Sequence, residues 1–379
     1  MSQQPLSGIR VLDFSTLLPG PLAALMLAEA GAEVIRIERP EGEEMRRYAP
    51  RWGDDSLYFA LLNRGKKSVA LDLKADDAVA RLTPLIQNAD VLIEQFRPGV
   101  MARLGLDYEQ VKAIRPDIIY CSITGYGQSG PKAQIAGHDL NYIAETGLLS
   151  LSYGSAAVPT VPPGLMADIG GGSMPAVLNI LLALIRRSTT GAGAHLDIAM
   201  ADAMFTLGWW ALGEGRATGR WPGNAEGALI GGSPRYRPYA TRDGRLVAVA
   251  ALEDKFWERL CALVELEPRL RDDARDPEAT TRALKAIFSS KPAEAWASRL
   301  HGEDCAANVV RSLDEAAADP HFAERGLFDL MIENGAGERV AATTVPIDRQ
   351  FRDAPGTARR APALGADNDL LGNGEEAAD

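Results

Sequence analysis

One histidine of the chain follows a glycine-rich stretch and is a candidate acid or base. His138 stands between Gly137 and Asp139, downstream of the turn-rich residues 125–131, which themselves follow a predicted strand. Loops at this place carry the active sites of many α/β enzymes, and a histidine titrates near neutral pH. His138 is therefore a candidate for proton transfer. Local spacing alone also allows a histidine that caps a helix or fills the core.

An aspartate stands close to the most glycine-rich point of the chain. Asp168 precedes three glycines at 170–172, and the apolar run that follows predicts a long helix from these glycines to about Arg187. Aspartate is favoured as a helix N-cap, and the free N–H groups of a helix start also bind anions and oxyanions. Asp168 is thus a candidate nucleophile or proton acceptor, or it only caps the helix. The triphosphate-binding loop motif is absent, so nucleoside triphosphate hydrolysis is not supported.

Seven basic residues lie at or near the ends of predicted strands. Several of them should meet at the carboxyl edge of a parallel sheet, where arginine forks suit phosphate groups. The cluster is therefore consistent with a phosphorylated ligand, although each charge alone is more typical of a solvated side chain. No Gly-x-Gly-x-x-Gly motif follows a strand, which weakens a dinucleotide-binding interpretation. The seven are Arg36, Arg39, Lys66, Lys67, Lys74, Arg97 and Arg103.

A glutamate follows a hydrophobic strand in the second half of the chain. Glu253 comes directly before a predicted helix. Taken by itself, it is an acid at a helix N-terminus, where the helix dipole favours negative charge. The Gly-x-Ser-x-Gly motif of the nucleophile elbow does not occur, so the sequence does not indicate a Ser–His–Asp triad.

Composition excludes several classes of function. The 379 residues include 40 lysines and arginines and 51 aspartates and glutamates, a net charge of −11. This acidic balance argues against nucleic acid as a partner. The three cysteines and four histidines form no disulfide framework and no metal-binding motif. No signal peptide is visible, and the apolar stretch 174–185 is too short to cross a bilayer and predicts a buried helix. We expect a cytoplasmic protein that does not act at a membrane.

Short β-rich runs alternate with helical periodicity over the first 200 residues. This alternation is typical of a parallel sheet covered on both faces. Past residue 235, a hairpin over 237–250 and three amphipathic helices predict a smaller α+β unit. We therefore expect an α/β protein with a large Rossmann-like parallel-sheet domain plus a smaller α+β domain. The expected strands of the sheet are 9–14, 33–37, 68–73, 90–94, 117–122 and 195–200.

The expected domain boundaries follow these changes of pattern. Residues 1–200 form the large α/β domain, and 201–234 form a linker helix and loop. Residues 235–325 form the small α+β domain. The last segment, 326–379, returns to the large domain.

The chain resembles the family III CoA-transferases over nearly its whole length. The resemblance includes Asp304-Cys305 and Asp319-Pro320-His321 in the second half. The group contains formyl-CoA and carnitine CoA-transferases and α-methylacyl-CoA racemases, and it implies an enzyme that acts on CoA thioesters, with residues 1–200 as the CoA-binding domain. The segments that carry the resemblance are LSGIRVLDFS (6–15), LPGP (18–21), GAEVIRIERP (31–40), NRGKKSVALDLK (63–74) and FRPGVMARLGL (96–106).

Three segments resemble the racemase branch of this family. They are AGHDLNY (136–142), ADIGGGSM (167–174) and VAVAALEDKFW (247–257). In racemases the residues matching His138 and Asp168 are the two catalytic bases, and the glutamate matching Glu253 comes from the partner subunit and orients the histidine. Transferases of the group usually have a non-basic residue in place of the histidine and use the aspartate as a nucleophile. Segment 44–64 is longer and looks more transferase-like.

The resemblance implies an α-methylacyl-CoA racemase of lipid metabolism. Such an enzyme interconverts (R)- and (S)-2-methylacyl-CoA by 1,1-proton transfer through an enolate, whose oxygen the N–H groups at the start of the helix after Asp168 could stabilise. The alternatives are a CoA-transferase that forms an aspartyl-CoA intermediate on Asp168, and a catalytically silent dimer that binds CoA thioesters. We expect no separate cofactor and no metal, because CoA is part of the substrate. The resemblance also implies an interlocked homodimer and a CoA site formed by Arg39, Leu73, Lys74, Arg97 and Arg103.

Overall fold

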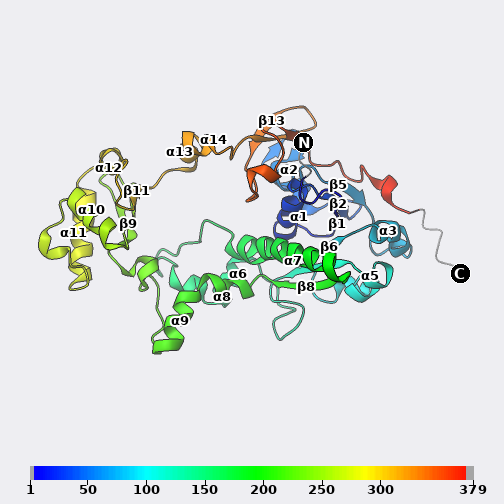
Figure 1. Ribbon diagram of the computed structural model, residues 1–379, viewed down its shortest axis with the longest axis horizontal. Helices are drawn as coiled ribbons and strands as arrows, with labels where there is room; N and C mark the ends of the chain where they lie inside the picture. The colour runs from blue at the N-terminus through cyan, green and yellow to red at the C-terminus, as the bar shows by residue number, and fades with distance from the viewer. Residues whose placement is uncertain (1–3, 373–379) are drawn as a thin grey trace. The chain divides into compact units, whose positions relative to one another are not determined.

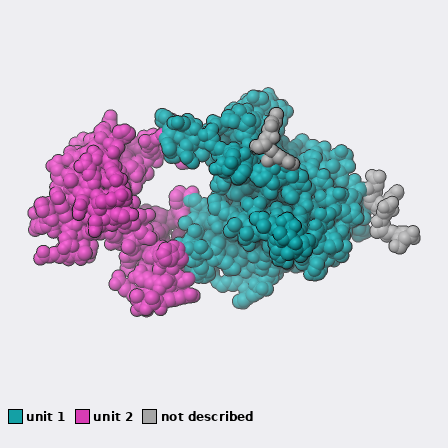
Figure 2. Space-filling view, viewed as in Figure 1, with its two compact units in different colours: residues 1–146, 164–207, 320–379 teal, residues 147–163, 208–319 magenta. Residues whose placement is uncertain are grey.

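The chain folds into two compact units, each built from separated stretches of sequence. The computed structural model describes residues 4–372. Unit 1 contains residues 1–146, 164–207 and 320–379, and unit 2 contains residues 147–163 and 208–319 (Figure 2). The predicted boundaries differ from this division in four places. Residues 147–163 cluster with unit 2 rather than with the large domain, and residues 208–234 are part of unit 2 rather than a separate linker. Residues 201–207, predicted in the linker, and residues 320–325, predicted in the small domain, belong to unit 1.

Unit 1 is organised around a six-stranded sheet in which every neighbouring pair of strands is parallel. The strand order is β5-β2-β1-β6-β7-β8. Each strand lies within about three residues of its predicted position. The α/β architecture with a large parallel sheet is therefore confirmed. The strands are β1 (Arg10–Asp13), β2 (Glu33–Glu38), β5 (Lys67–Ala70), β6 (Val91–Glu94), β7 (Ile119–Thr124) and β8 (Ala194–Ala199).

The strand order reverses direction at the centre of this sheet. From β1 the chain proceeds outward through β2 to β5, then returns to place β6 on the other side of β1. The loops that leave the carboxyl ends of β1 and β6 therefore diverge. Open α/β sheets bind ligands in the crevice that forms at such a switch point.

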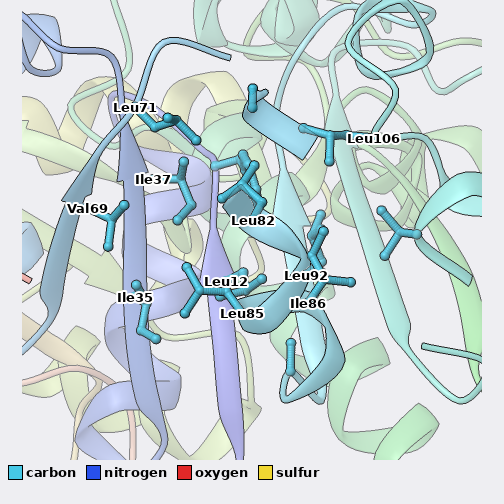
Figure 3. Close-up of a cluster of buried hydrophobic side chains, with 14 of the residues drawn as sticks. Leu12, Ile35, Ile37, Val69, Leu71, Leu82, Leu85, Ile86, Leu92 and Leu106 are labelled. Atoms are coloured by element: carbon cyan, nitrogen blue, oxygen red, sulfur yellow. The ribbon is translucent and has the colours of Figure 1, made fainter. Parts of the chain in front are cut away.

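One face of the sheet packs against α3 (Ala78–Gln87), whose apolar side chains repeat at helical spacing. Leu82, Leu85 and Ile86 contact a layer of strand residues that includes Leu12 and Leu92, as Figure 3 shows. All of these side chains are buried. Burial of a leucine or isoleucine contributes about 1.5–3 kcal/mol to the free energy of unfolding. This layer therefore stabilises the strands whose carboxyl ends carry the loops.

The other face packs against α1 (Pro19–Glu29) and α7 (Met174–Thr190), which also contact each other (Figure 1). The prediction of a buried helix holds for one side of α7 only. An apolar stripe on its outer side, 36–66% exposed, consists of Met174, Leu178, Leu181, Leu182 and Ile185. The continuous helical run Met166–Thr190 is long and apolar enough to cross a membrane, a test that core helices of soluble proteins also pass.

The edge strand β5 is covered by residues from the far end of the chain. Asp367 accepts a hydrogen bond from the N–H of Ser68 at 2.9 Å, and Asn368 accepts one from the N–H of Ala70 at 2.7 Å. The N–H of Asp367 donates in turn to the carbonyl of Ser68 at 2.9 Å. The C-terminal segment thus returns to the large domain and satisfies the polar groups of the sheet edge.

Unit 2 contains a small antiparallel sheet and three amphipathic helices, as the sequence predicts. Strands β9 (Tyr236–Ala240) and β10 (Leu246–Ala250) form the expected hairpin, and β11 (Ala307–Val309) pairs with β10. The helices cover one buried core together with these strands. They are α10 (Asp254–Leu263), α11 (Pro277–Ser289) and α12 (Ala293–Leu300).

Shorter elements connect these layers. In unit 1 they include the helices α2 (Leu57–Asn63), α4 (Val100–Arg103), α5 (Tyr108–Ile114), α6 (Asp139–Glu145), α8 (Asp202–Leu207) and α14 (Pro320–Glu324), with the hairpin β3 (Arg51–Trp52) and β4 (Asp55–Ser56). A three-stranded sheet follows near the C-terminus, formed by β12 (Leu330–Glu333), β13 (Arg339–Ala342) and β14 (Ala358–Arg359). Unit 2 adds α9 (Trp209–Thr218) and α13 (Leu313–Ala317).

Candidate active site

The two candidate proton-transfer residues, far apart in sequence, line one cavity of unit 1. The cavity has a volume of about 420 Å³ and opens beyond the carboxyl ends of β6, β7 and β8. His138 and Asp168 lie in its wall with Arg97, Asn141 and Tyr142. The structure thus brings together the histidine and the aspartate that the sequence singled out. We call this space the catalytic cavity.

His138 is the N-cap residue of α6, so the capping alternative describes its backbone correctly. Its N–H donates to Oδ1 of Asn141 at 3.1 Å, which fixes the start of the helix. The hydroxyl of Tyr142 donates to the carbonyl of Gly137 at 2.5 Å. A Cβ on Gly137 would lie 2.8 Å from the Tyr142 ring, so this position requires glycine. The His138 side chain itself is exposed toward the cavity.

Asp168 does not cap a helix, contrary to one of the two predictions for it. The helical turn that carries it, η3 (Met166–Ser173), begins at Met166, and Asp168 lies in its first turn. The first N–H groups of this turn are already bound, because Oδ1 of Asp139 accepts them from Ala167 at 2.6 Å and from Asp168 at 3.0 Å. The predicted oxyanion site at the start of this helix is therefore wrong.

Two of the three glycines after Asp168, Gly171 and Gly172, serve close packing. They lie inside η3, which continues directly into α7, so the helix does not begin at them. A Cβ on Gly171 would lie 2.3 Å from the carbonyl oxygen of Met200, and one on Gly172 would lie 2.9 Å from Cβ of Pro19. Glycine at these positions lets the turn approach the loop after β8 and the start of α1. This contact places Asp168 at the sheet edge.

The pKa of Asp168 is raised to about 6. Burial is the largest cause, the neighbouring Asp139 carboxylate adds to it, and His138 opposes it. An acid with this pKa exchanges its proton readily near neutral pH, as general acid–base catalysis requires. The raised pKa of Asp168 and the shared cavity together make His138 and Asp168 a candidate acid–base pair.

A second cavity, also of about 420 Å³, lies beyond the ends of β1, β2 and β5. Three of the five predicted CoA-binding residues line it, namely Arg39, Leu73 and Lys74. Arg97 lines the catalytic cavity instead, and Arg103 ends α4 between the lining residues Val100 and Leu104. We call this space the nucleotide cavity.

Four of these predicted residues carry positive charge that the protein leaves uncompensated. Arg39, Lys74, Arg97 and Arg103 are exposed, and none of them forms an ion pair within residues 4–372. Arg39 does donate to the carbonyl of Gly42 at 2.7 Å, which orients its guanidinium. Free cations around a cavity attract phosphate groups. The arrangement suits a ligand with several phosphates.

The other three basic residues of the predicted cluster have structural roles. Arg36 and Lys66 are fully buried and both bind Asp13, at 3.3 Å and 3.1 Å. Lys67 pairs with Glu33 at 2.5 Å at the surface. Buried charges need such partners, so these cations hold the strand ends together and are not free for a ligand.

Glu253 lies in unit 2, where it directly precedes α10 and is exposed to solvent. This agrees with the helix-terminus interpretation of its local sequence. Its predicted role in orienting His138 stays a prediction.

Sequence reasoning missed the residues that hold the site in place. Asp139 follows His138 directly, but nothing in the local pattern shows that its carboxylate reaches 28 residues along the chain to Ala167. Leu17 and Phe96 were also missed, although both line the two cavities. Their positions in the loops that follow β1 and β6 are a signal that a search for the switch point of the sheet could have used.

Solved structures share this fold along the whole chain. A CAIB/BAIF family protein from Brucella suis superposes with a TM-score of 0.81, is 28% identical, and matches 97% of this chain and 98% of its own. A protein from Mycobacterium tuberculosis gives a TM-score of 0.81 at 29% identity, over 97% of this chain and 99% of its own.

Curated relatives include both racemases and transferases. Mouse α-methylacyl-CoA racemase is 36% identical over 85% of this chain and 82% of its own length, and the human racemase is 34% identical over 89% and 85%. Acetyl-CoA:oxalate CoA-transferase of Acetobacter aceti is 34% identical over 87% and 86%. The family model of CoA-transferase family III matches residues 6–368. With this match and these relatives, the chain belongs to CoA-transferase family III, whose members act on CoA thioesters.

Proposed function

We propose that the protein is an α-methylacyl-CoA racemase. The observation that carries the proposal is that His138 and Asp168 line the same cavity, and that His138 influences the proton affinity of Asp168. A racemase needs two groups that exchange protons at one carbon. The 36% identity to the mouse racemase supports the same assignment.

The proposed reaction moves one proton off the α-carbon and another onto it. One of His138 and Asp168 takes the α-proton from one face of the 2-methylacyl-CoA, which leaves an enolate. The other group then protonates the opposite face, and the two exchange roles for the other enantiomer. Positioned acid–base groups contribute about 10²–10⁴ in rate.

The enolate oxygen requires hydrogen-bond donors. The N–H groups at the start of η3 are bound to Asp139, so they do not serve. We assign this role to N–H donors of the side chains that line the catalytic cavity, among them Arg97 and Asn141. One such donor contributes about 10²–10³ in rate.

We propose that the CoA moiety occupies the nucleotide cavity. The free cations Arg39 and Lys74 at that cavity suit its phosphates, and Leu73 adds an apolar contact. CoA is part of the substrate, and the proposed proton transfers use side chains alone, so no further cofactor or metal enters the scheme. Glu253 of a partner subunit would orient His138, as the family resemblance implies.

The exposed apolar stripe on α7 supports the proposed homodimer. A row of five large apolar side chains on one helix face is unfavourable in water, and burial against another copy would remove this cost. An interlocked dimer of the kind that the resemblance implies would also bring Glu253 of the partner subunit to the site. A membrane surface is the competing partner for such a stripe, and the oligomeric state of the purified protein distinguishes the two.

Isotope exchange tests the proposed racemase. A 2-methylacyl-CoA is incubated in deuterated buffer without an acceptor acid, and deuterium at the α-carbon is followed together with loss of optical purity. We expect both to occur with the wild-type protein, and His138→Ala to slow them about 10²–10⁴-fold. His301→Ala serves as the control, because it removes an exposed histidine that lines neither cavity. Absence of α-deuterium in the wild-type reaction would exclude the racemase.

The exposure of Asp168 to the cavity also fits a CoA-transferase, the second candidate function. In that reaction a carboxylate oxygen of Asp168 attacks the thioester carbonyl and releases CoA thiolate, which leaves a mixed anhydride. The thiolate then attacks the aspartyl carbonyl, releases the first acid and forms an aspartyl-CoA thioester. Mass spectrometry of the protein incubated with acyl-CoA and an acceptor carboxylate would detect this adduct. Transfer that survives in His138→Ala, with no α-exchange in the wild type, would favour this function.

A further inference from the structure

The catalytic and nucleotide cavities adjoin at two residues. Leu17 and Phe96 are lining residues of both cavities. Leu17 follows β1 and Phe96 follows β6, and these are the adjacent strands at which the sheet reverses its order. Leu17 and Phe96 therefore mark the place where the two cavities meet.

Each of these two residues is held through its backbone by a buried carboxylate. Oε1 of Glu43 accepts the N–H of Leu17 at 2.5 Å, and Oε2 of Glu94 accepts the N–H of Phe96 at 2.8 Å. The glutamates are only 4% and 3% exposed. Burying a carboxylate is costly unless it is bound. Two separate buried carboxylates therefore fix the backbone positions of Leu17 and Phe96, the two residues at which the cavities adjoin.

The first of these carboxylates, that of Glu43, holds a residue with a strained backbone, Leu17. Leu17 has a φ of +60°, in the left-handed region that leucine rarely adopts. Such a conformation persists only where its surroundings impose it. Arg36 supplies the anchor, because its guanidinium binds Glu43 and also donates to the carbonyl of Ser15 at 3.3 Å.

The second carboxylate, that of Glu94, is hydrogen-bonded to a neighbouring strand of the sheet. The carboxylate of Glu94 is hydrogen-bonded by the hydroxyl of Ser122 on the neighbouring strand β7. The Ser122 hydroxyl in turn lies 3.0 Å from Nε2 of His195 on β8. Glu94 therefore connects the Phe96 backbone to the two strands that lie beyond it.

We propose that Leu17 and Phe96 form a neck for the pantetheine arm of the substrate, and that Glu43 and Glu94 are positioning residues that set its width. The proposal rests on the proposed function in one respect, namely that a CoA thioester spans both cavities. The neck acts on the carrier and not on the reacting carbon. It therefore contributes to binding of CoA and leaves the chemistry in the catalytic cavity unchanged.

Free CoA is the probe for this neck, and its dissociation constant is measured by calorimetry. We expect Glu43→Gln and Glu94→Gln to weaken CoA binding about tenfold each, since an amide oxygen accepts the N–H of the neck residue more weakly than the native acid does. Glu29→Gln is the matched control, because Glu29 is equally buried, is bound to Arg64 and lines neither cavity. It should bind CoA as the wild type does.

A glycine variant and a short substrate complete the test. Leu17→Gly fits the left-handed backbone and removes one wall of the neck, so it should fold and bind CoA more weakly. With an N-acetylcysteamine thioester, which lacks the nucleotide and does not span the neck, kcat/KM should be the same in Glu43→Gln, Glu94→Gln and the wild type. The proposed neck would be overturned if Glu43→Gln and Glu94→Gln lowered kcat/KM with the short thioester as much as they weaken CoA binding. Unchanged CoA binding in all three neck variants would overturn it as well. Failure of the wild type to bind CoA would overturn the proposed function as well.

Discussion

Asp139→Asn separates the two effects that the Asp139 carboxylate exerts on Asp168. The amide oxygen can still accept the N–H groups of Ala167 and Asp168, which lie 2.6 Å and 3.0 Å from Oδ1 in the native protein. The negative charge, which helps to raise the pKa of Asp168 to about 6, is lost. The substitution should therefore loosen the helical turn that carries Asp168 and make Asp168 a stronger acid.

The magnitudes follow from these contacts. A neutral acceptor contributes about 1 kcal/mol less per hydrogen bond than a charged one, so two bonds amount to roughly 2 kcal/mol. Local opening of residues 166–173 should become about 30-fold more frequent. The pKa of Asp168 should fall by less than its full displacement from 3.8 to about 6, because burial is the larger cause.

Two assays read these effects separately. Hydrogen exchange reports the opening of residues 166–173. The pKa of Asp168 is read from the acid limb of the pH profile of kcat/KM, measured in the reaction direction in which Asp168 accepts the proton. Because Asp168 must be ionised to accept a proton, activity of the native enzyme should fall below pH about 6, and the limb of the variant should lie at lower pH. Asp107→Asn, which removes a charged N-cap of α5 away from the site, should change neither. A limb that stays in place or moves to higher pH would refute the electrostatic argument, and unchanged exchange would refute the anchoring.

Three further predictions test the cavities and the packing around them. Arg39→Ala and Lys74→Ala should each weaken CoA binding about tenfold at low salt and less at high salt, measured by calorimetry, whereas Lys67→Ala, whose charge is already paired, should not. Leu182→Glu places a charge in the exposed stripe of α7 and should shift a dimer to monomer in sedimentation; an unchanged dimer would exclude the stripe as its interface. Gly171→Ala would place a Cβ 2.3 Å from the Met200 carbonyl and should lower the unfolding free energy by about 1–3 kcal/mol; a neutral effect would contradict the packing role.

The sheet and the candidate residues His138 and Asp168 were predictable because their signals are local. Each strand of unit 1 is a short β-rich run, and the period of its residues decides the element before any long-range contact forms. His138 and Asp168 stand in short glycine-rich motifs, and both lie at the expected edge of the sheet. Resemblance to a family then assigned them to one site.

What could not be predicted depends on contacts between distant residues. Asp139 fixes the start of the helical turn at Met166, because its carboxylate accepts the N–H of Ala167. Arg36 and Lys66 are buried because both form an ion pair with Asp13. A sequence pattern shows that a residue is basic but not whether an acid from another strand reaches it. The exposed side of α7 was missed for a similar reason, since an apolar helix face has the same composition whether the chain itself or another surface covers it.

The cover on strand β5 affects how the protein is made in the cell. Its hydrogen-bond partners Asp367 and Asn368 lie 299 and 298 residues further along the chain, so the ribosome must complete all of unit 2 before they emerge. Until then the nascent sheet presents an open strand edge, which is a template for aggregation. Asp367 and Asn368 can therefore cover this edge only after unit 2 has been synthesised, and a chain truncated before residue 367 would lack the cover.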